Sequence, residues 1–217
     1  MLALQTFGAD IWIADGPPVK AFGPFTLPTR MIVVKLRDGS LWINSPVQAS
    51  PADMRRIAEL GPVRYLVSPS SMHTWRLASW AAVFPEAQRW APPQILRDDA
   101  PEGWSADLEQ LVFRGNAFLE EVEFLHPGSR TLIFNDFIQN YPPQPQRPLV
   151  DALLKLSGSR GGGVPNDIKV SFIRKELARR SLRKLLSWDF DNLILAHGDC
   201  ITAGAKAFTE SAFRFLR

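Results

Sequence analysis

The stretch MIVVKLRDGSLWIN, residues 31–44, is the clearest structural signal in the chain. Two apolar runs flank the Asp-Gly pair at 38–39, and this arrangement is typical of a β-hairpin. Residues 50–53 read Ser-Pro-Ala-Asp, which supplies a capping hydroxyl, a proline at the first helical position and an acid in the first turn. This pattern predicts a helix over 51–60, and residues 64–67 then predict a buried strand.

Outside this region the sequence predicts more strands and helices in alternation. Strands are expected at 11–13, 89–91, 121–125, 131–134 and 192–195. Helices are expected at 75–84, 147–157, 169–187 and 204–216. Glu121 and Glu123 alternate with apolar neighbours, so one face of their strand should meet water. The order of elements predicts a mixed α/β (α+β) fold in which two sheets pack together under helices, in a single domain of residues 1–217.

The composition is that of an ordinary folded protein and excludes several classes. Of 217 residues, 46% are apolar and 22% are charged, which suits a packed core. No run approaches the roughly 20 apolar residues that span a bilayer, so we expect a cytoplasmic protein without a membrane partner. Cys200 is the single cysteine, so a metal would have to be held by His, Asp or Glu. The net charge of +3 is mild, and nucleic acid is not the expected partner.

Polar residues capable of binding a metal stand just after three of the predicted strands: His73, Asp136 and His197. Residues at strand ends converge at the rim of a sheet, where active sites are usually built. The three side chains therefore predict one shared pocket.

The order of elements resembles the metallo-β-lactamase fold superfamily over nearly the whole chain. In that family a Thr-His-x-His-x-Asp-His motif follows the strand that here ends at 67. Residues 68–74 read Ser-Pro-Ser-Ser-Met-His-Thr, so Pro69 and Ser71 stand where the first two histidines would be. His73 lies at the Asp position or, with a one-residue gap, at the last His.

Three later segments extend the resemblance. Gly115-Asn116-Ala117 resembles a Gly-His-Thr turn that has lost its His, and Phe134-Asn135-Asp136 resembles the bridging-aspartate segment. Residues 195–199 resemble the final His-Gly segment. Ser181-Leu182 and residues 188–191 are similar to an uncharacterised branch of the superfamily, a domain of unknown function with a degenerate metal motif.

The resemblance implies a four-layer αββα sandwich and a reduced metal site. Its metal ligands would be His73, Asp136 and His197, with Asp136 and His197 as catalytic residues and Ser71 and Asn116 in the pocket. Three protein ligands suffice for one open metal site and are too few for two. The implied cofactor is one zinc or another divalent metal, or none.

Each of these residues also has a structural interpretation. His73 could cap the next helix, His197 could bind only a carbonyl, and Asp136 could cap a turn. His126 is expected to be a solvated turn residue, and Trp104 is a candidate pocket wall. Four tryptophans are expected in the core: Trp12, Trp42, Trp75 and Trp80.

Three functions stay open on the sequence. The chain could be a hydrolase whose metal-bound water attacks an ester, amide or phosphoester, or a binding or structural module that keeps the fold without catalysis. The third is an RNA-binding or RNA-processing protein that uses the predicted helix at 169–187. Its basic residues are Arg174, Lys175, Arg179, Arg180, Arg183 and Lys184. Such a face can bind phosphates, although a charged helix face is usually only its solvated side. The substrate or small ligand stays unspecified.

Overall fold

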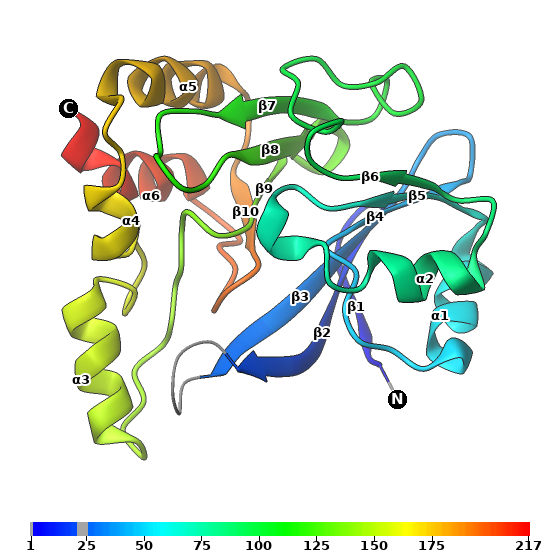
Figure 1. Cartoon of the computed structure of the whole chain (residues 1–217), viewed down its shortest axis with the longest axis horizontal. Coiled ribbons are helices and arrows are strands. Elements are labelled where there is room, and N and C mark those ends of the chain that lie inside the picture. The colour runs from blue at the N-terminus through cyan, green and yellow to red at the C-terminus, as the bar shows by residue number, and fades with distance from the viewer. Residues whose placement is uncertain (1, 21–25) are drawn as a thin grey trace. The chain divides into compact units, whose positions relative to one another are not determined.

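The structure, a computed structural model, describes residues 2–20 and 26–217. Its backbone contacts group into two compact units, of which unit 1 comprises residues 1–96 and 101–107 and unit 2 comprises residues 97–100 and 108–217. Each unit has one sheet at its centre with helices packed on it (Figure 1). The predicted mixed α/β fold with two sheets and helices is therefore confirmed, whereas the single domain stays a prediction.

Unit 1 is built on a six-stranded sheet of order β1-β2-β3-β4-β5-β6. The strands are β1 (Leu4–Gly8), β2 (Ile11–Lys20), β3 (Thr26–Lys35), β4 (Leu41–Asn44), β5 (Val63–Val67) and β6 (Gln88–Trp90). The helices are α1 (Pro51–Ile57) and α2 (Leu77–Val83), and 3₁₀ turns cover Ala58–Leu60 and Ser71–His73. β4, β5 and β6 run parallel, so the loops that follow β5 and β6 leave the sheet at one edge.

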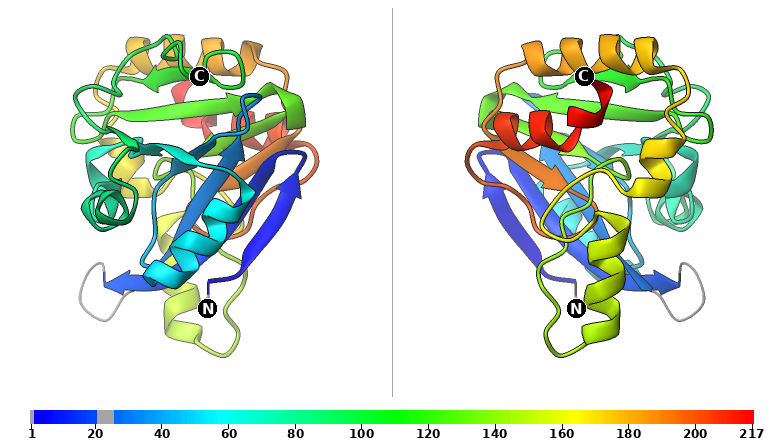
Figure 2. Two further views of the ribbon diagram at one scale, coloured as in Figure 1. Left: turned by 90° about the vertical axis from the view of Figure 1, so that its right-hand side faces the viewer. Right: turned by 90° about the vertical axis from the view of Figure 1, so that its left-hand side faces the viewer.

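The local signals of unit 1 act as the sequence predicts. In the β3–β4 hairpin, Asp38 Oδ1 accepts from the backbone N–H of Ser40 at 2.9 Å, and Gly39 takes a φ of 83°. At the start of α1, the Ser50 hydroxyl accepts from the backbone N–H of Asp53 at 3.1 Å. Helix α1 lies across the strands in the left view of Figure 2. Four helix residues pack into the apolar cluster of this sheet: Met54, Ile57, Leu77 and Trp80.

Unit 2 is built on a four-stranded sheet of order β10-β9-β8-β7. The strands are β7 (Glu109–Phe113), β8 (Glu121–His126), β9 (Thr131–Phe134) and β10 (Asn192–Leu195). The helices are α3 (Pro148–Ser157), α4 (Asn166–Val170), α5 (Lys175–Ser187) and α6 (Ala205–Ala212), with 3₁₀ turns at Pro127–Ser129 and Arg214–Leu216. No helix in the described part of the chain combines the length and the apolar character needed to cross a membrane.

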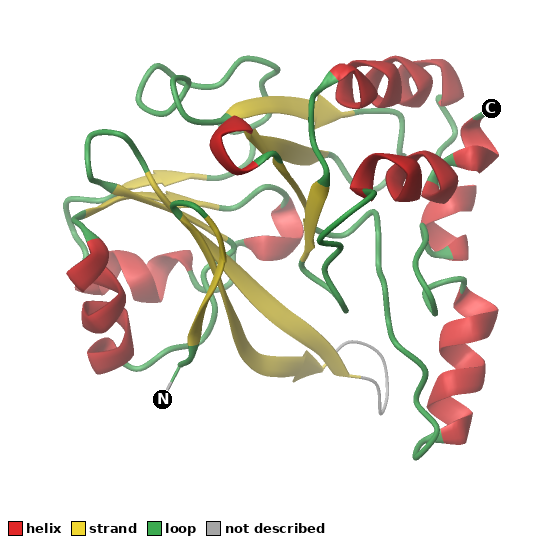
Figure 3. Cartoon of the chain, turned by 180° about the vertical axis from the view of Figure 1, so that it is seen from behind, coloured by secondary structure: helices red, strands yellow, loops and turns green. Residues whose placement is uncertain are grey.

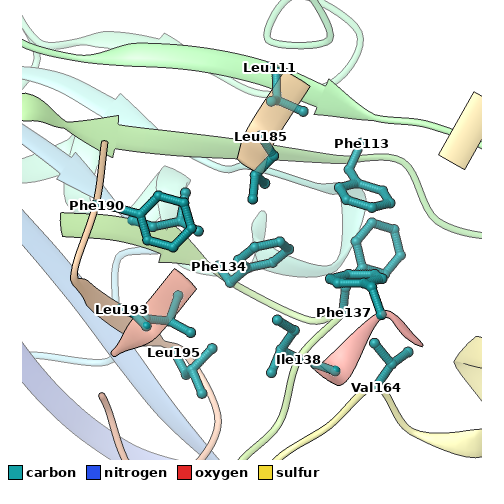
Figure 4. Close-up of a cluster of buried hydrophobic side chains, with 14 of the residues drawn as sticks. Leu111, Phe113, Phe134, Phe137, Ile138, Val164, Leu185, Phe190, Leu193 and Leu195 are labelled. Carbon is teal, nitrogen blue, oxygen red and sulfur yellow. The ribbon is translucent and has the colours of Figure 1, made fainter. Parts of the chain in front are cut away.

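An apolar cluster rich in phenylalanine holds the helices of unit 2 on its sheet (Figure 4). The ring of Phe113 on β7 stacks on that of Phe213 at 4.8 Å and meets the edge of Phe137 at 5.4 Å. Leu185 of α5 and Phe134 of β9 belong to the same cluster and are fully buried. Offset and edge-on ring pairs of this kind add to the free energy gained by burial, so this face of the sheet is firmly covered.

Glu121 and Glu123 are fully buried, so the prediction that their face of β8 meets water is wrong. The register explains the difference, because Glu121 lies opposite Phe113 and Glu123 lies opposite Leu111 in the antiparallel pair. Directly opposed residues share a face of a sheet, and this face is the one that carries the phenylalanine cluster. The alternation of polar and apolar residues correctly separates the two faces but does not show that the residues on both faces are buried.

Three further side chains differ from their predicted environments. His126 is buried rather than solvated, and its Nδ1 lies 2.7 Å from the Ser129 hydroxyl. Trp75 is 56% exposed, because it precedes the start of α2. Trp104 is fully buried against the rings of Tyr65 and Trp90, at 4.9 and 5.0 Å, and is therefore a core residue rather than a pocket wall.

The helix predicted over 169–187 is interrupted between Val170 and Lys175. The interruption is tied to the loop after β7: the backbone N–H of Ala117 donates to Ser171 O at 2.8 Å and that of Arg174 donates to Gly115 O at 3.1 Å. These long-range bonds use backbone groups that a continuous helix would bond internally. Two strands of the structure, β1 and β7, are not predicted from the sequence.

Candidate metal centre

The candidate site in unit 2 is set by the pairing of β9 and β10. These strands run parallel, with Phe134 opposite Leu195 in the register. Asp136 and His197 each come two residues later, so both side chains leave the sheet at the same edge. His197 Nε2 lies 3.1 Å from Asp136 Oδ1, and the side chains are only 7% and 15% exposed. The structure thus brings together the two residues predicted to be catalytic.

The backbone of His197 is fixed by the loop that crosses it. The backbone N–H of Asn140 donates to His197 O at 3.1 Å, and that of Asp199 donates to Asn140 O at 2.8 Å. Between them Gly198 adopts a φ of 92°, and a Cβ there would lie 2.0 Å from Asn140 O. Only glycine fits so close a crossing at a positive φ, which accounts for the glycine after the histidine.

The segment that carries Asp136 is held from inside the core by Glu121. Glu121 Oε1 accepts from the backbone N–H of Asn135 at 2.6 Å, and Oε2 accepts from that of Asp136 at 2.8 Å. A carboxylate that accepts two N–H bonds in a buried place makes short, strong hydrogen bonds. Glu121 therefore fixes the point at which the chain leaves β9 and turns toward the site.

A second buried carboxyl group, that of Glu123, lies next to Glu121. We call the two hydrogen bonds that Glu121 accepts from the backbone of Asn135 and Asp136 the Glu121 clamp. Burial raises the pKa of Glu123 well above its usual range, and the negative charge of Glu121 raises it further. Two adjacent carboxylates cannot both be charged at low cost in a core, so the protonated form of Glu123 is favoured. As a neutral acid it can donate a hydrogen bond toward Glu121, which keeps its charge for the two backbone N–H groups.

Tyr141 is a further polar group near Asp136. Burial, and then the negative charge of Asp136, raise the pKa of Tyr141 to about 12, so its phenol stays protonated. The hydroxyl oxygen is buried and makes no hydrogen bond to any residue that the structure describes. A buried polar group of this kind calls for a partner such as a water or a ligand. Nothing in the sequence pattern singles out Tyr141 as a site residue.

The other predicted site residues have different surroundings. His73 and Ser71 lie directly after β5 in unit 1, in the 3₁₀ turn that the Ser70 hydroxyl caps at 3.2 Å from the backbone N–H of Met72. The side chain of Asn116 donates to the Ser171 hydroxyl at 2.7 Å and accepts from the backbone N–H of Phe118 at 3.0 Å. Asn116 thus organises its own loop. That Ser71 and Asn116 line a pocket stays a prediction, and so does a site that His73 shares with Asp136 and His197.

The pair of Asp136 and His197 fits the chemistry of a divalent metal. A carboxylate oxygen and an imidazole nitrogen are ordinary zinc ligands, and two such atoms on one tetrahedral ion lie about 3.3 Å apart. The observed separation of 3.1 Å needs little adjustment. The same separation also suits a direct hydrogen bond between the two side chains.

Glu121 and Glu123 are the contributors to this site that sequence reasoning misplaced. Their signal was available: both acids interrupt a strand that is otherwise apolar, between segments that carry candidate ligands. A buried carboxylate needs hydrogen-bond donors, and the backbone N–H groups just after the end of a neighbouring strand can supply them.

Comparisons of the sequence with known families and curated proteins give one match. A family model described as a domain of unknown function (DUF4336) matches residues 10–97, and no curated protein matches the chain.

Solved structures match over the whole length. An NDM/FIM-1-like metallo-β-lactamase from Erythrobacter litoralis in its mono-zinc form is 11% identical with a TM-score of 0.65, over 99% of this chain and 96% of that one. A metallo-β-lactamase from Pontibacter korlensis is 12% identical with a TM-score of 0.65, over 100% and 99%. A fragment of a diflavin flavoprotein from Nostoc sp. is 8% identical with a TM-score of 0.65, over 99% and 96%. This chain has the metallo-β-lactamase fold.

Proposed function

We propose, from the metallo-β-lactamase fold of this chain, that it is a hydrolase with a single divalent metal ion held by Asp136, His197 and His73. The observation that carries the proposal is the approach of His197 Nε2 to Asp136 Oδ1 at 3.1 Å, at the ends of two adjacent strands. When bound, the metal would supply an acidified water able to attack an ester, amide or phosphoester.

The protein's own residues have distinct tasks in this proposal. Asp136 offers a carboxylate oxygen whose position is set through the backbone bonds to Glu121. His197 offers Nε2, and its main chain is held by Asn140. Tyr141 presents a protonated phenol near Asp136, which could donate a hydrogen bond to the substrate. Neighbours that orient ligands in this way commonly change metal affinity 10- to 100-fold when they are removed.

A single metal is favoured over a pair by the residues that are missing. Pro69 and Ser71 stand where the family motif has its first two histidines, and Asn116 stands where its turn has another. Neither a proline nor a neutral oxygen donor replaces an imidazole for zinc. The mono-zinc form of the Erythrobacter litoralis relative supports the idea that this fold accommodates one ion.

The same losses favour a second function, a metal-free binding module. The Asn116 side chain is engaged within its own loop, which suggests that this part of the family site has been given over to structure. In such a module Asp136 and His197 would form a hydrogen-bonded pair, and Tyr141 would contact a ligand instead of a substrate.

Hydrolysis of chromogenic substrates separates the two functions. The substrates are an ester, an anilide and a phosphodiester, each tested with chelator-treated protein before and after zinc or manganese is added back. We expect metal-restored turnover of at least one substrate, reduced at least about a hundredfold in Asp136→Ala. Asp199→Ala is the matched control, because Asp199 is an exposed acid two residues from His197. Activity that survives in Asp136→Ala, or turnover that does not depend on metal, would count against the metal hydrolase.

A further inference from the structure

Unit 2 carries an apolar surface that nothing in the structure covers. We call it the α3 surface, and it comprises Phe118, Leu149, Leu153, Leu156, Val170 and Ile173. These side chains are between 46% and 88% exposed, and in unit 2 they are all of the exposed large apolar side chains that the structure describes. Soluble monomers seldom expose several large apolar side chains together, and such patches mark interaction surfaces.

Helix α3 presents its apolar stripe outward. Leu149, Leu153 and Leu156 stand at spacings of four and three residues, which places them on one face of the helix. The adjoining side of the helix, with Val150 and Leu154, is only half-buried, and no residue of α3 is fully buried. A helix of a globular protein normally turns its leucine stripe toward the core. The reversed arrangement indicates a helix that is completed by contact with something else.

Hydrogen bonds hold together the segments that carry the α3 surface. The Asn166 side chain at the start of α4 donates to Leu156 O at 2.9 Å, which ties the end of α3 to α4. The bond of 2.8 Å from the backbone N–H of Ala117 to Ser171 O brings the Phe118 loop to the end of α4. Helices α3 and α4 follow one another along the same edge in Figures 1 and 3.

Basic side chains outnumber acidic ones beside this patch. Arg147 and Lys155 are exposed on and beside α3, and Arg174 and Lys175 are exposed beside Ile173. Of the nearby acids, Asp151 pairs with Arg160 at 2.8 Å and Glu176 pairs with Arg179, whereas Glu120 and Asp167 are exposed. The patch therefore combines exposed leucine side chains with a basic border.

We propose that the α3 surface docks the protein onto an anionic lipid bilayer, with α3 lying in the plane of the interface. The leucines would enter the boundary between head groups and acyl chains, while the basic residues face anionic head groups. This mode of contact needs no long apolar segment. The absence of an apolar run long enough to span a bilayer therefore does not exclude it, although that absence predicts no membrane partner.

Charge and chemistry favour a bilayer over the other two occupants. A second copy of this chain would bring two basic borders together, and like charges oppose such a pairing. An RNA would bind the arginine and lysine side chains but would leave the leucine stripe in water. An anionic bilayer satisfies both parts of the surface at once.

Vesicle co-sedimentation of the full chain tests the proposal. The probes are vesicles of phosphatidylcholine alone and vesicles with about 30% phosphatidylglycerol, at about 0.1 M and about 0.5 M salt. We expect binding to the anionic vesicles that weakens at the higher salt. The variant Leu149→Ser/Leu153→Ser/Leu156→Ser should bind at least about tenfold more weakly, because three leucines no longer leave water. Since these side chains are already exposed, its circular dichroism and thermal midpoint should match those of the parent.

Two charge-reversal variants supply the matched control. Arg147→Glu/Lys155→Glu should weaken binding to the anionic vesicles, whereas Arg180→Glu/Arg183→Glu changes the net charge equally on exposed residues of α5 and should weaken it much less. Light scattering of the parent and of the leucine variant reports self-association. A dimer that the leucine variant abolishes, with no vesicle binding, would assign the surface to a second copy and overturn the proposal. Vesicle binding that is equal in the parent and the leucine variant, or absent from both without dimerisation, would also overturn it.

Discussion

His197 Nε2 and Asp136 Oδ1 lie 3.1 Å apart because their two strands are parallel and in register. Each residue follows its strand by two positions, so the pairing of Phe134 with Leu195 determines where both side chains emerge. The candidate site therefore depends on the backbone of unit 2, and on the buried residues that fix that backbone, as much as on the two side chains themselves.

Glu121→Gln should loosen the segment that carries Asp136. A glutamine offers one acceptor oxygen, and its NH₂ group would face a backbone N–H that Glu121 now satisfies. We expect the free energy of unfolding, measured with urea, to be about 1–3 kcal/mol lower than in the parent. The amides of Asn135 and Asp136 should also exchange faster with solvent. Glu123→Gln is the control and should leave both amides protected, because a neutral donor replaces a neutral donor. Equal protection in the two variants would refute the Glu121 clamp.

Glu123 should make the folded chain less stable as the pH rises. Its pKa is raised by burial above the ordinary value of 4.5, so the folded state holds the proton more tightly than the unfolded state. The stabilisation that the tightly held proton provides is fully present below pH 4.5. It is lost as the pH rises through the pKa of Glu123 in the folded state. The stability of Glu123→Gln relative to the parent should therefore increase as the pH rises above that ordinary value. A difference that stays constant over this range would contradict the prediction.

Gly198→Ala should disturb the position of His197. A Cβ at this place would lie 2.0 Å from Asn140 O, so the loop has to move as well as accept a positive φ. Gly161→Ala is the matched control: its φ is also positive, at 74°, but nothing lies within 4 Å of its Cβ. We expect a loss of about 1–2 kcal/mol in the control from the left-handed backbone alone, and a clearly larger loss at Gly198. Chemical denaturation of both variants measures the difference.

RNA should not bind tightly to α5. Arg179 is engaged by Glu176 and by the carbonyl of Leu216, so one of the six basic residues is already committed. For exposed Arg180 and Arg183, the double change to glutamate should alter stability by no more than about 0.5 kcal/mol. Fluorescence anisotropy with an RNA oligomer should show no submicromolar binding at physiological salt. Tight, salt-sensitive binding that this variant abolishes would instead support the RNA-processing function.

The sequence predicts several elements well because their signals are local. The Asp-Gly turn at 38–39, the Ser50 cap and the short apolar runs before Asp136 and His197 require no knowledge of distant residues. Strand ends are similarly local, so the candidate ligands could be found on the pattern alone.

The environment of those elements could not be predicted because it depends on long-range contacts. The burial of Glu121 and Glu123 follows from the register with β7, a strand that the sequence did not reveal. The interruption before α5 follows from bonds to the loop at 115–117, and the outward leucines of α3 follow from how that helix is oriented. Periodicity identifies an amphipathic helix but does not show which way its apolar stripe faces.

Metal stoichiometry tests the central claim most directly. The full chain and three variants, His73→Ala, Asp136→Ala and His197→Ala, are dialysed against zinc and then against metal-free buffer, and elemental analysis gives the zinc bound per chain. Asp199→Ala serves as the control for loss of a nearby acid. The proposal predicts about one zinc per chain in the parent and in Asp199→Ala, and a small fraction of that in each ligand variant. Substoichiometric zinc in the parent, or equal zinc in the parent and Asp136→Ala, would contradict the single-metal hydrolase and favour the metal-free binding module.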